Sequence, residues 1–371
     1  MNIKRNILLN PGPATTSDTV KQALIVSDIC PREQEFGMLM DSIRKDLVKV
    51  IHGGDDYVAV LFTASGTGGV EAALTSAVPL GKKVLIVDNG AYGTRMTQIA
   101  KTFHIDVVHY KIPYGDYPDV TEIKKLIEQN NEISHIAMVH HETTTGMLNP
   151  VKEISQMAHQ MGIEMVVDTV SSYAGLPINV KEYNLEFMVS TSNKCIQGMP
   201  GLSFVIVKKT ALAKLEPNRR SFYLDVLSQH QCFEKTFQTQ FTPPVQIVYA
   251  LRQALDEYFQ ETEAGRDKRY RENWKLLYHG VTNIGFKALL PLEQESQILT
   301  AFCEPLDAVY SFEKMHDYLY NHGFTIYPGK GAKKDTFRLS ILGDLYKEDI
   351  SNFLNVLKEY VKENKISFKY N

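Results

Sequence analysis

The chain has 371 residues, of which 44% are hydrophobic and 22% are charged, a balance typical of a globular protein too long for one ordinary core. Its formal net charge of -3 provides no basic surface for nucleic acid. No apolar run reaches the ~20 residues that cross a bilayer, and residues 1–13 lack the apolar core of a signal peptide. We therefore expect a cytoplasmic protein with no nucleic-acid or membrane partner.

The spacing of the cysteines and of the paired histidines argues against a metal site or a disulfide framework. Cys30, Cys195, Cys232 and Cys303 lie far apart and form no CxxC pair. His140 and His141 are neighbours at a strand end, so their side chains point to opposite faces. We expect reduced thiols, no metal, and one of these two histidines buried with the other at the rim of the sheet.

The first segments read as an arm, a capped helix and a charged loop. Two prolines flank Gly12, which indicates an extended arm over residues 1–15, and Ser17 or Thr16 is placed to cap a helix. Arg32 follows a proline in the next loop. It is either a solvated turn charge or an anion contact, since its planar fork suits a phosphonate or carboxylate.

Two strand-to-helix turns then carry candidate ligand contacts. The apolar strand 57–62 runs into a small-residue turn that contains Ser65, Gly66 and Thr67, and a helix follows. Glycine-rich backbone and a helix amino terminus bind phosphate, although such turns are common and this one matches no nucleotide motif. Tyr92 occupies a similar turn after strand 84–87. It either stacks on a flat ligand ring or packs on its own helix.

A carboxylate and an amine end two further strands, and they suggest Schiff-base chemistry. Residues 164–167 form an apolar strand that ends in Asp168, and residues 187–190 form another that leads to Lys194. Ligands of α/β sheets bind beyond the carboxyl ends of the strands. Pyridoxal phosphate (PLP) needs such a lysine for its imine and an acid for its pyridine nitrogen. The alternatives are a solvated lysine and a capping aspartate.

The remaining pattern predicts a doubly wound domain followed by a smaller one. With strands at 106–110, 133–139 and 202–207 the count reaches seven, which indicates a large domain over 16–260 with a mostly parallel sheet. Residues 219–240 resemble neither core nor linker. A long helix from residue 245 carries the hinge, and residues 261–371 alternate into a small α/β domain. Arg338 lies there on a strand, either in an internal ion pair or facing an anion in the cleft between domains.

Several segments together resemble the class-V branch of the fold-type I PLP aminotransferases, over nearly the whole chain. The matching segments are NPGP at 10–13, ASGTGG at 64–69, DNGAYG at 88–93, HETTTGMLNP at 141–150, VDTVSSYAG at 167–175, STSNKCIQGMPG at 190–201, FTPP at 241–244 and YPGK at 327–330. Within this branch they look most like the enzymes that use 2-aminoethylphosphonate and pyruvate. The resemblance implies PLP as cofactor, a seven-stranded PLP-binding domain and a homodimer with shared active sites.

The resemblance also implies roles for matching residues. Lys194 would carry the aldimine and shuttle a proton, and Asp168 would pair with the pyridine nitrogen. Arg338 would bind the substrate phosphonate and carboxylate. The other cofactor contacts implied are the ring contacts Tyr92 and Thr143, the phosphate contacts Ser65, Gly66 and Thr67 with Ser192 nearby, and Thr242, which would reach the phosphate of the neighbouring subunit. Arg32 as a second substrate contact is a hypothesis that the resemblance does not carry.

Three alternatives stay open at this point. A serine- or alanine-glyoxylate aminotransferase would share every cofactor residue and differ in its amino donor. A desulfurase-type lyase needs a mobile reactive cysteine, whereas Cys303 lies in an apolar strand where we expect it to be inert. A non-catalytic protein of this fold would leave the lysine, the aspartate and the glycines without a shared purpose.

Overall fold

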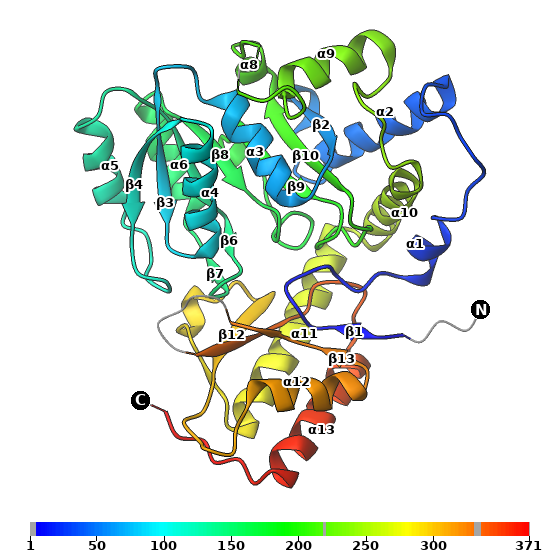
Figure 1. The fold of residues 1–371 in the computed structure, drawn as a ribbon, viewed down its shortest axis with the longest axis vertical. Coiled ribbons are helices and arrows are strands. Elements are labelled where there is room, and N and C mark those ends of the chain that lie inside the picture. The colour runs from blue at the N-terminus through cyan, green and yellow to red at the C-terminus, as the bar shows by residue number, and fades with distance from the viewer. Residues whose placement is uncertain (1–4, 218–219, 330–334, 371) are drawn as a thin grey trace.

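The computed structural model describes residues 5–217, 220–329 and 335–370, and it contains two α/β units (Figure 1). One unit is built on a seven-stranded sheet and the other on a four-stranded sheet. Lys330, the last residue of the YPGK segment, lies outside the described residues. The large mostly parallel sheet with covering helices confirms the expected α/β fold of the PLP aminotransferases.

The large sheet is a buried parallel sheet with one reversed strand. Its order is β2 (Tyr57–Thr63), β10 (Leu202–Lys208), β9 (Phe187–Thr191), β8 (Glu164–Asp168), β5 (Ile133–Val139), β3 (Lys83–Asp88) and β4 (Asp106–Lys111). β10 runs antiparallel to both of its neighbours, and the other pairs are parallel. The inner strands are almost continuous apolar runs, because helices cover both faces of a parallel sheet.

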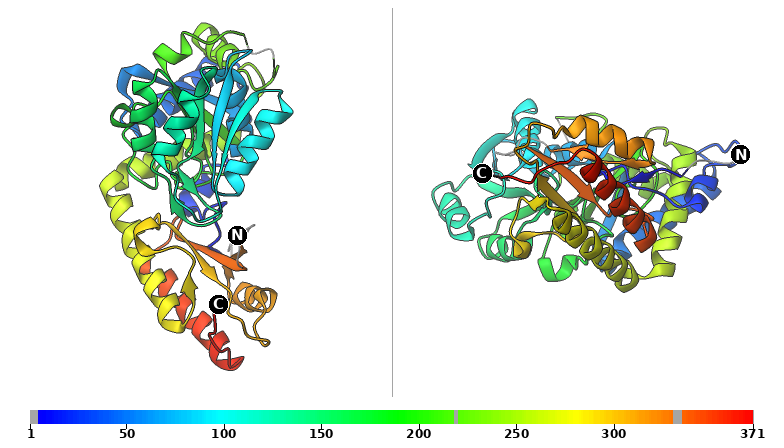
Figure 2. Two further views of the ribbon diagram at one scale, coloured as in Figure 1. Left: turned by 90° about the vertical axis from the view of Figure 1, so that its left-hand side faces the viewer. Right: turned by 90° about the horizontal axis from the view of Figure 1, so that it is seen from below.

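Two apolar cores lie on the two faces of this sheet. The left view of Figure 2 shows the helices that cover these faces. One core packs against α2 (Gln34–Lys49), α5 (Val120–Glu128), α6 (Val151–Gln160) and α10 (Val245–Glu261). The other packs against α3 (Gly66–Ala77) and α4 (Ala91–Thr102). Shorter helices at the edges are α7 (Val180–Tyr183) and α8 (Lys209–Leu212), and a 3₁₀ turn spans Gly54–Asp56.

The segment 219–240 contains a helix that its sequence did not predict. α9 spans Val226–Thr236, and Asp225 caps it by accepting a hydrogen bond from the backbone N–H of Ser228 at 3.1 Å. Its buried side chains are Val226, Gln229 and Phe233. A stripe that sparse, with a glutamine in it, gives a weak helical period.

The smaller unit is an antiparallel sheet covered by long helices. Its strand order is β11 (Lys287–Ala288), β12 (Leu299–Cys303), β15 (Thr336–Ser340) and β14 (Tyr327–Pro328). Around it lie α11 (Glu263–Ile284), α12 (Phe312–Asn321), α13 (Lys347–Glu363) and the 3₁₀ turn Leu292–Gln294. Thr262, at a φ of 69°, separates α10 from α11. The domain limits 1–15, 16–260 and 261–371 stay a prediction.

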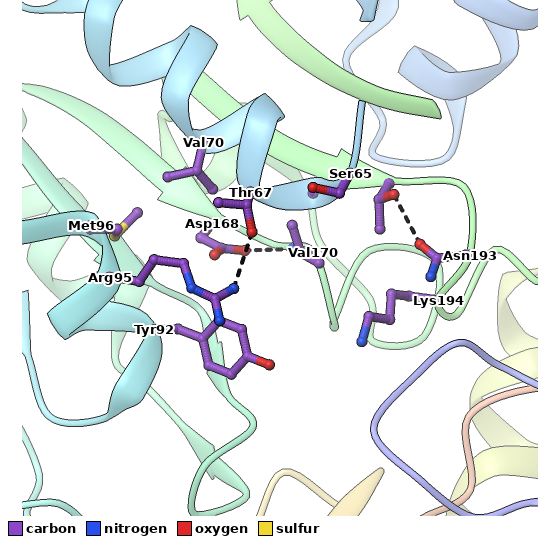
Figure 3. A pocket seen from close by; sticks show the side chains of 12 residues that line it. Ser65, Thr67, Val70, Tyr92, Arg95, Met96, Asp168, Val170, Asn193 and Lys194 are labelled. Carbon is purple, nitrogen blue, oxygen red and sulfur yellow. Dashed lines mark hydrogen bonds between the residues drawn. The ribbon is translucent and has the colours of Figure 1, made fainter. Parts of the chain in front are cut away.

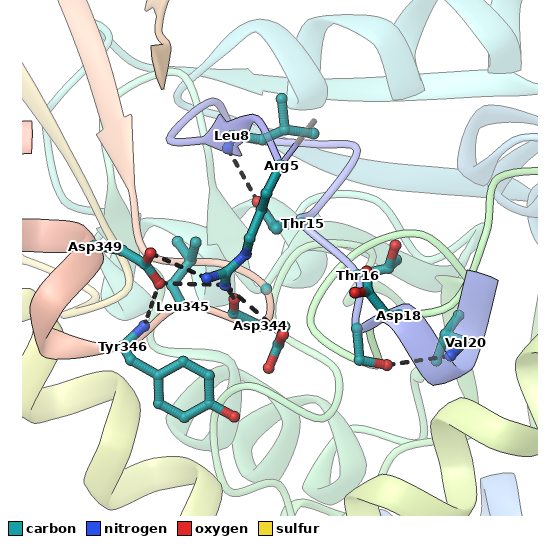
Figure 4. A network of polar contacts seen from close by, with 12 residues as sticks. Arg5, Leu8, Thr15, Thr16, Asp18, Val20, Asp344, Leu345, Tyr346 and Asp349 are labelled. Carbon is teal, nitrogen blue, oxygen red and sulfur yellow. Dashed lines mark hydrogen bonds and ion pairs between the residues drawn. The ribbon is translucent and has the colours of Figure 1, made fainter. Parts of the chain in front are cut away.

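The described part of the amino-terminal arm pairs with a strand of the smaller unit. β1 (Ile7–Leu8) pairs in parallel with β13 (Phe324–Thr325). Arg5 donates to Asp349 at 3.2 Å and to the carbonyl of Asp344 at 2.7 Å. Figure 4 shows how these residues lie. The arm then crosses to the large unit, where α1 (Asp18–Gln22) begins after its cap Ser17.

The helices and cysteines of the described residues form neither a membrane span nor a disulfide bond. No helix of residues 5–217, 220–329 and 335–370 is long and apolar enough to cross a membrane. Cys30, Cys195, Cys232 and Cys303 are not joined by disulfides.

Candidate active site

A cavity lies beyond the carboxyl ends of β2, β3, β8 and β9, and it collects six of the residues singled out from the sequence (Figure 3). Its volume is about 170 Å³, and it opens to solvent. The lining residues are Ser65, Gly66, Thr67, Val70, Tyr92, Arg95, Met96, Asp168, Val170, Thr191, Asn193 and Lys194.

The start of α3 forms an anion cup on one wall of this cavity. Ser65 precedes the helix in extended conformation, and Gly66 and Thr67 are its first residues. The first amides of a helix have no acceptor within it, and the helix dipole adds partial positive charge there. A Cβ at Gly66 would lie 2.9 Å from a methyl group of Val170, so glycine allows α3 to approach the strand end. This arrangement suits a phosphate.

Lys194 is a half-buried amine held by the amino-terminal arm. Its Nζ donates to the backbone carbonyl of Pro11. Burial lowers the pKa of Lys194 to about 8, and the positive charges of Arg338 and Arg95 act in the same direction. An amine of lowered pKa is available as a nucleophile and base near neutral pH.

Asp168 ends β8 at the floor of the cavity, where its side chain is 6% exposed. Burial raises the pKa of Asp168 to about 6, while the backbone N–H of Val170, Arg95 and Lys194 oppose that rise. Val170 donates to its Oδ1 at 2.8 Å. A buried carboxylate with these partners can pair with a protonated ring nitrogen.

Glu142 is a site residue to which the sequence assigned no role. It follows β5 in the hairpin of β6 (His141–Glu142) and β7 (Met147–Leu148). It is fully buried and accepts hydrogen bonds from the backbone N–H groups of Tyr92, at 3.2 Å, and of Thr144, at 3.0 Å. Burial raises its pKa to about 7. Glu142 thereby fixes the first turn of α4, which carries Tyr92.

Arg338 and Thr143 lie next to the cavity and contact each other. The Nη1 of Arg338 donates to the carbonyl of Thr143 at 3.2 Å, and its Nε donates to the carbonyl of Pro328 at 3.1 Å. Burial lowers the pKa of the Arg338 guanidinium, and nearby Tyr92 and Glu142 oppose this change. The arginine therefore joins the smaller unit to the β6–β7 hairpin at the edge of the site.

Three other residues singled out from the sequence do not reach the cavity within one chain. The hydroxyl of Ser192 is buried and donates to the carbonyls of Leu202, at 3.2 Å, and Met199. Thr242 is exposed. The guanidinium of Arg32 donates to the carbonyl of Thr239 at 2.6 Å, beside the segment that carries Thr242.

The expectation that one histidine of the pair sits at the rim is wrong, because both are buried. His140 is 5% and His141 1% exposed, and their Nδ1 atoms lie 2.9 and 3.0 Å from the hydroxyls of Ser172 and Ser171. Burial lowers their pKa values to about 4 and about 3. The segment after Asp168 folds over both rings, which strand alternation alone does not reveal.

The cavity residues fit PLP in chemical type. The anion cup suits its phosphate, Tyr92 offers an aromatic face, Asp168 a buried carboxylate and Lys194 an amine. The backbone at Gly12 packs closely against Lys194, since any side chain at Gly12 would overlap the Nζ of Lys194.

Comparison with known proteins identifies the family. Residues 19–353 match the family model described as aminotransferase class-V. The chain belongs to the class-V aminotransferases. The cofactor of this class-V aminotransferase is pyridoxal phosphate, in agreement with the resemblance seen in the sequence.

Curated relatives align with almost the whole length of this class-V aminotransferase. Proteins named 2-aminoethylphosphonate–pyruvate transaminase from Salmonella heidelberg and Bacillus thuringiensis are each 39% identical to it, and each alignment covers 96% of this chain and 98% of the relative. Alanine–glyoxylate aminotransferase from Nostoc sp. superposes with a TM-score of 0.90 at 27% identity, covering 97% of this chain and 96% of that one. Pyridoxamine-pyruvate aminotransferase from Mesorhizobium loti has a TM-score of 0.88 at 22% identity, covering 98% and 94%, and supports the fold alone.

Proposed function

We propose that this class-V aminotransferase transfers the amino group of 2-aminoethylphosphonate to pyruvate and forms phosphonoacetaldehyde and L-alanine. The observation that carries this proposal is that relatives named 2-aminoethylphosphonate–pyruvate transaminase are 39% identical along 96% of the chain. The two substrates would use one cavity in turn, in ping-pong order. Transamination is near equilibrium, so either direction of phosphonate metabolism is compatible with the site.

In this proposal Lys194 is the proton carrier. PLP, when bound, supplies an aldehyde for the substrate amine and a ring that accepts electrons from the neighbouring carbon. With a pKa of about 8, Lys194 has about a tenth of its amine unprotonated at pH 7. It would take a proton from the carbon that bears nitrogen and return it to the product. Asp168 would hold the proton of the ring nitrogen.

Arg338 would bind the substrate anion. Its guanidinium is 5% exposed and fixed by the carbonyls of Thr143 and Pro328, so it is held at the edge of the cavity. A planar fork of donors suits both the phosphonate of the amine and the carboxylate of pyruvate. Replacement of Arg338 by Lys would keep the charge and lose this fork.

A homodimer completes the proposal, because it gives a role to residues that the single chain leaves outside the cavity. Phe222 is 82% exposed, and Tyr223 stacks on Phe241 with ring centroids 4.8 Å apart, on the segment just before Thr242. An exposed aromatic group of this kind marks an interaction surface. A second copy seated here would bring Thr242 to the phosphate of its neighbour.

Arg32 belongs to the same surface, where its guanidinium is bonded to Thr239. We propose it as a second anion contact that acts in the neighbouring subunit's cavity. An Arg32→Ala protein whose KM for 2-aminoethylphosphonate equals that of the wild type would remove this role. The cytoplasmic location also stays a prediction.

A serine- or alanine-glyoxylate aminotransferase is the second candidate. The Nostoc alanine–glyoxylate enzyme has the same fold at 27% identity, and the cofactor residues alone do not separate the two activities.

Product formation tests the proposal directly. Purified protein with added PLP is incubated with pyruvate and 2-aminoethylphosphonate, and both alanine and phosphonoacetaldehyde are quantified, with Lys194→Ala as the inactive control. Equal amounts of both products support the proposal. Turnover of alanine with glyoxylate, and none with the phosphonate, would support the second candidate instead.

A further inference from the structure

Arg95 is a charged residue of the cavity with no role so far. It lies on α4 one turn after Tyr92 and lines the cavity together with Asp168 and Lys194. Its Nη1 donates to the hydroxyl of Thr67 at 3.1 Å, and its guanidinium carbon is 4.7 Å from the centroid of the Tyr92 ring. Figure 3 shows the side chain extended along the tyrosine toward Thr67. Arg95 therefore connects the helix that carries the anion cup to the helix that carries the aromatic face.

The same guanidinium acts on the buried carboxylate. Among the charged groups that face Asp168, Arg95 and Lys194 favour the ionised form, and Glu142 from the β6–β7 hairpin opposes it. Lys194 gives up its positive charge whenever it serves as a base, whereas a guanidinium stays protonated in proteins. Of the two basic side chains that line the cavity, Arg95 is thus the permanent charge.

We propose that Arg95 is a positioning residue of the cofactor site, which sets Thr67 against Tyr92 and keeps Asp168 ionised. This inference rests on the proposed roles of Thr67, Tyr92 and Asp168, and it needs no contact between Arg95 and the reacting atoms. Two substitutions distinguish the positioning of Thr67 and Tyr92 from the effect of the charge on Asp168. Arg95→Lys keeps the charge and loses the planar fork, whereas Arg95→Gln loses the charge.

The charge predicts a pH dependence of cofactor binding. Burial already raises the pKa of Asp168 to about 6, and loss of Arg95 raises it further because one of the two opposing charges is gone. A protonated carboxyl group does not pair with a protonated ring nitrogen. Binding of PLP to Arg95→Gln should therefore begin to weaken, as the pH falls, about one unit above the wild-type midpoint.

Equilibrium titration of the apoproteins with PLP tests this, at pH values from about 5 to 9. Arg95→Gln should bind about tenfold to a hundredfold more weakly at pH 7 and show the raised midpoint. Arg95→Lys should recover the wild-type midpoint but only part of the affinity. Arg271→Gln is the matched control, since it removes an arginine whose side chain is 45% exposed and paired with Asp267. It should bind like the wild type.

The outcomes separate this inference from the function on which it rests. An Arg95→Gln protein with wild-type affinity and midpoint would overturn the inference, and so would a raised midpoint in Arg95→Lys equal to that in Arg95→Gln. If Arg95→Gln does not fold, Arg95→Lys carries the test, and wild-type affinity in that variant overturns the positioning role. A wild-type protein that binds no PLP would instead overturn the proposed function.

Discussion

Lys194 and Pro11 are joined by a hydrogen bond from the lysine amine to the proline carbonyl, across 183 residues of sequence. The arm that carries Pro11 is itself paired with β13 in the smaller unit. The amine on the large unit is therefore held by a segment anchored on the smaller one. Any change that lifts this arm should alter how Lys194 is presented to the cofactor.

Gly12→Ala should reduce cofactor affinity by at least about tenfold. Gly12 has a φ of 131°, and its Cβ would overlap the amine of Lys194. The backbone strain alone should cost about 1 kcal/mol or more of unfolding free energy. Gly81→Ala is the control, because Gly81 has a φ of 75° with open space around it. It should share a loss of stability in thermal unfolding and keep wild-type PLP affinity in the same titration.

The pKa of Lys194 predicts how cofactor attachment depends on pH. The neutral amine attacks the aldehyde of PLP, and burial lowers the pKa of this amine to about 8. The attachment rate should rise about tenfold per pH unit below pH 8 and level off above it. Stopped-flow absorbance of the apoprotein mixed with PLP measures this rate. The reaction of PLP with a free lysine derivative serves as control for the ionisation of PLP itself.

An attachment rate that keeps rising up to pH ~10.4, the ordinary pKa of lysine, would contradict the lowered pKa of Lys194.

The sequence predicted most strands and helices well, because the local spacing of apolar residues indicates which residues of each element are buried. The strand 133–139 and the helix 312–321 have the bounds of β5 and α12, since a mostly apolar run marks the strand and a clear helical period marks the helix. The helix α9 has too sparse an apolar stripe to be recognised. Asp168 and Lys194 each follow an apolar strand, and this pattern correctly predicted that both lie at one edge of the sheet.

The residues missed at the site depend on contacts between distant segments. Glu142 is buried because the β6–β7 hairpin folds against the start of α4, 50 residues earlier. Arg95 is recognisable only once Thr67, 28 residues away, is known to lie beside it. The only hint of this in the sequence is that Arg95 lies one helical turn after Tyr92, on the same face of the helix. Thr242 and Arg32 lie outside the cavity of their own chain, and the roles proposed for them need a second subunit.

Glu142→Gln should change how stability depends on pH. The folded pKa of Glu142 is raised by burial to about 7 from an ordinary 4.5, so its contribution is fully present below pH 4.5 and is lost as the pH rises through 7. The unfolding free energy of wild type minus variant should fall by about 3 kcal/mol over this window. Denaturant unfolding of the apoproteins at several pH values measures the difference.

Glu128→Gln is the control for Glu142→Gln, since Glu128 is 55% exposed and 3.9 Å from Lys124. Its difference from wild type should stay small, at about 0–1 kcal/mol. A flat difference for Glu142→Gln as well would show that its carboxyl group is not held in the protonated form.

Mixed dimers test whether Thr242 acts on the neighbouring subunit. A heterodimer of Lys194→Ala with Thr242→Ala has one cavity that combines an intact Lys194 with an intact Thr242 from the other chain. If Thr242 acts across the interface, this heterodimer should show about half of the wild-type activity at low PLP concentration. Separately tagged chains allow the heterodimer to be purified. Activity no higher than that of the Thr242→Ala homodimer, per intact lysine, would place Thr242 in the cavity of its own chain.

The most direct test of the proposed activity is a single half-reaction. The PLP-loaded protein is mixed, without keto acid, with 2-aminoethylphosphonate, with alanine or with serine, and loss of the cofactor's visible absorbance is followed. Rapid loss with the phosphonate and with alanine, but not with serine, is the predicted result. Rapid loss with serine, together with no change on addition of the phosphonate, would contradict the proposed donor and favour a serine-glyoxylate activity.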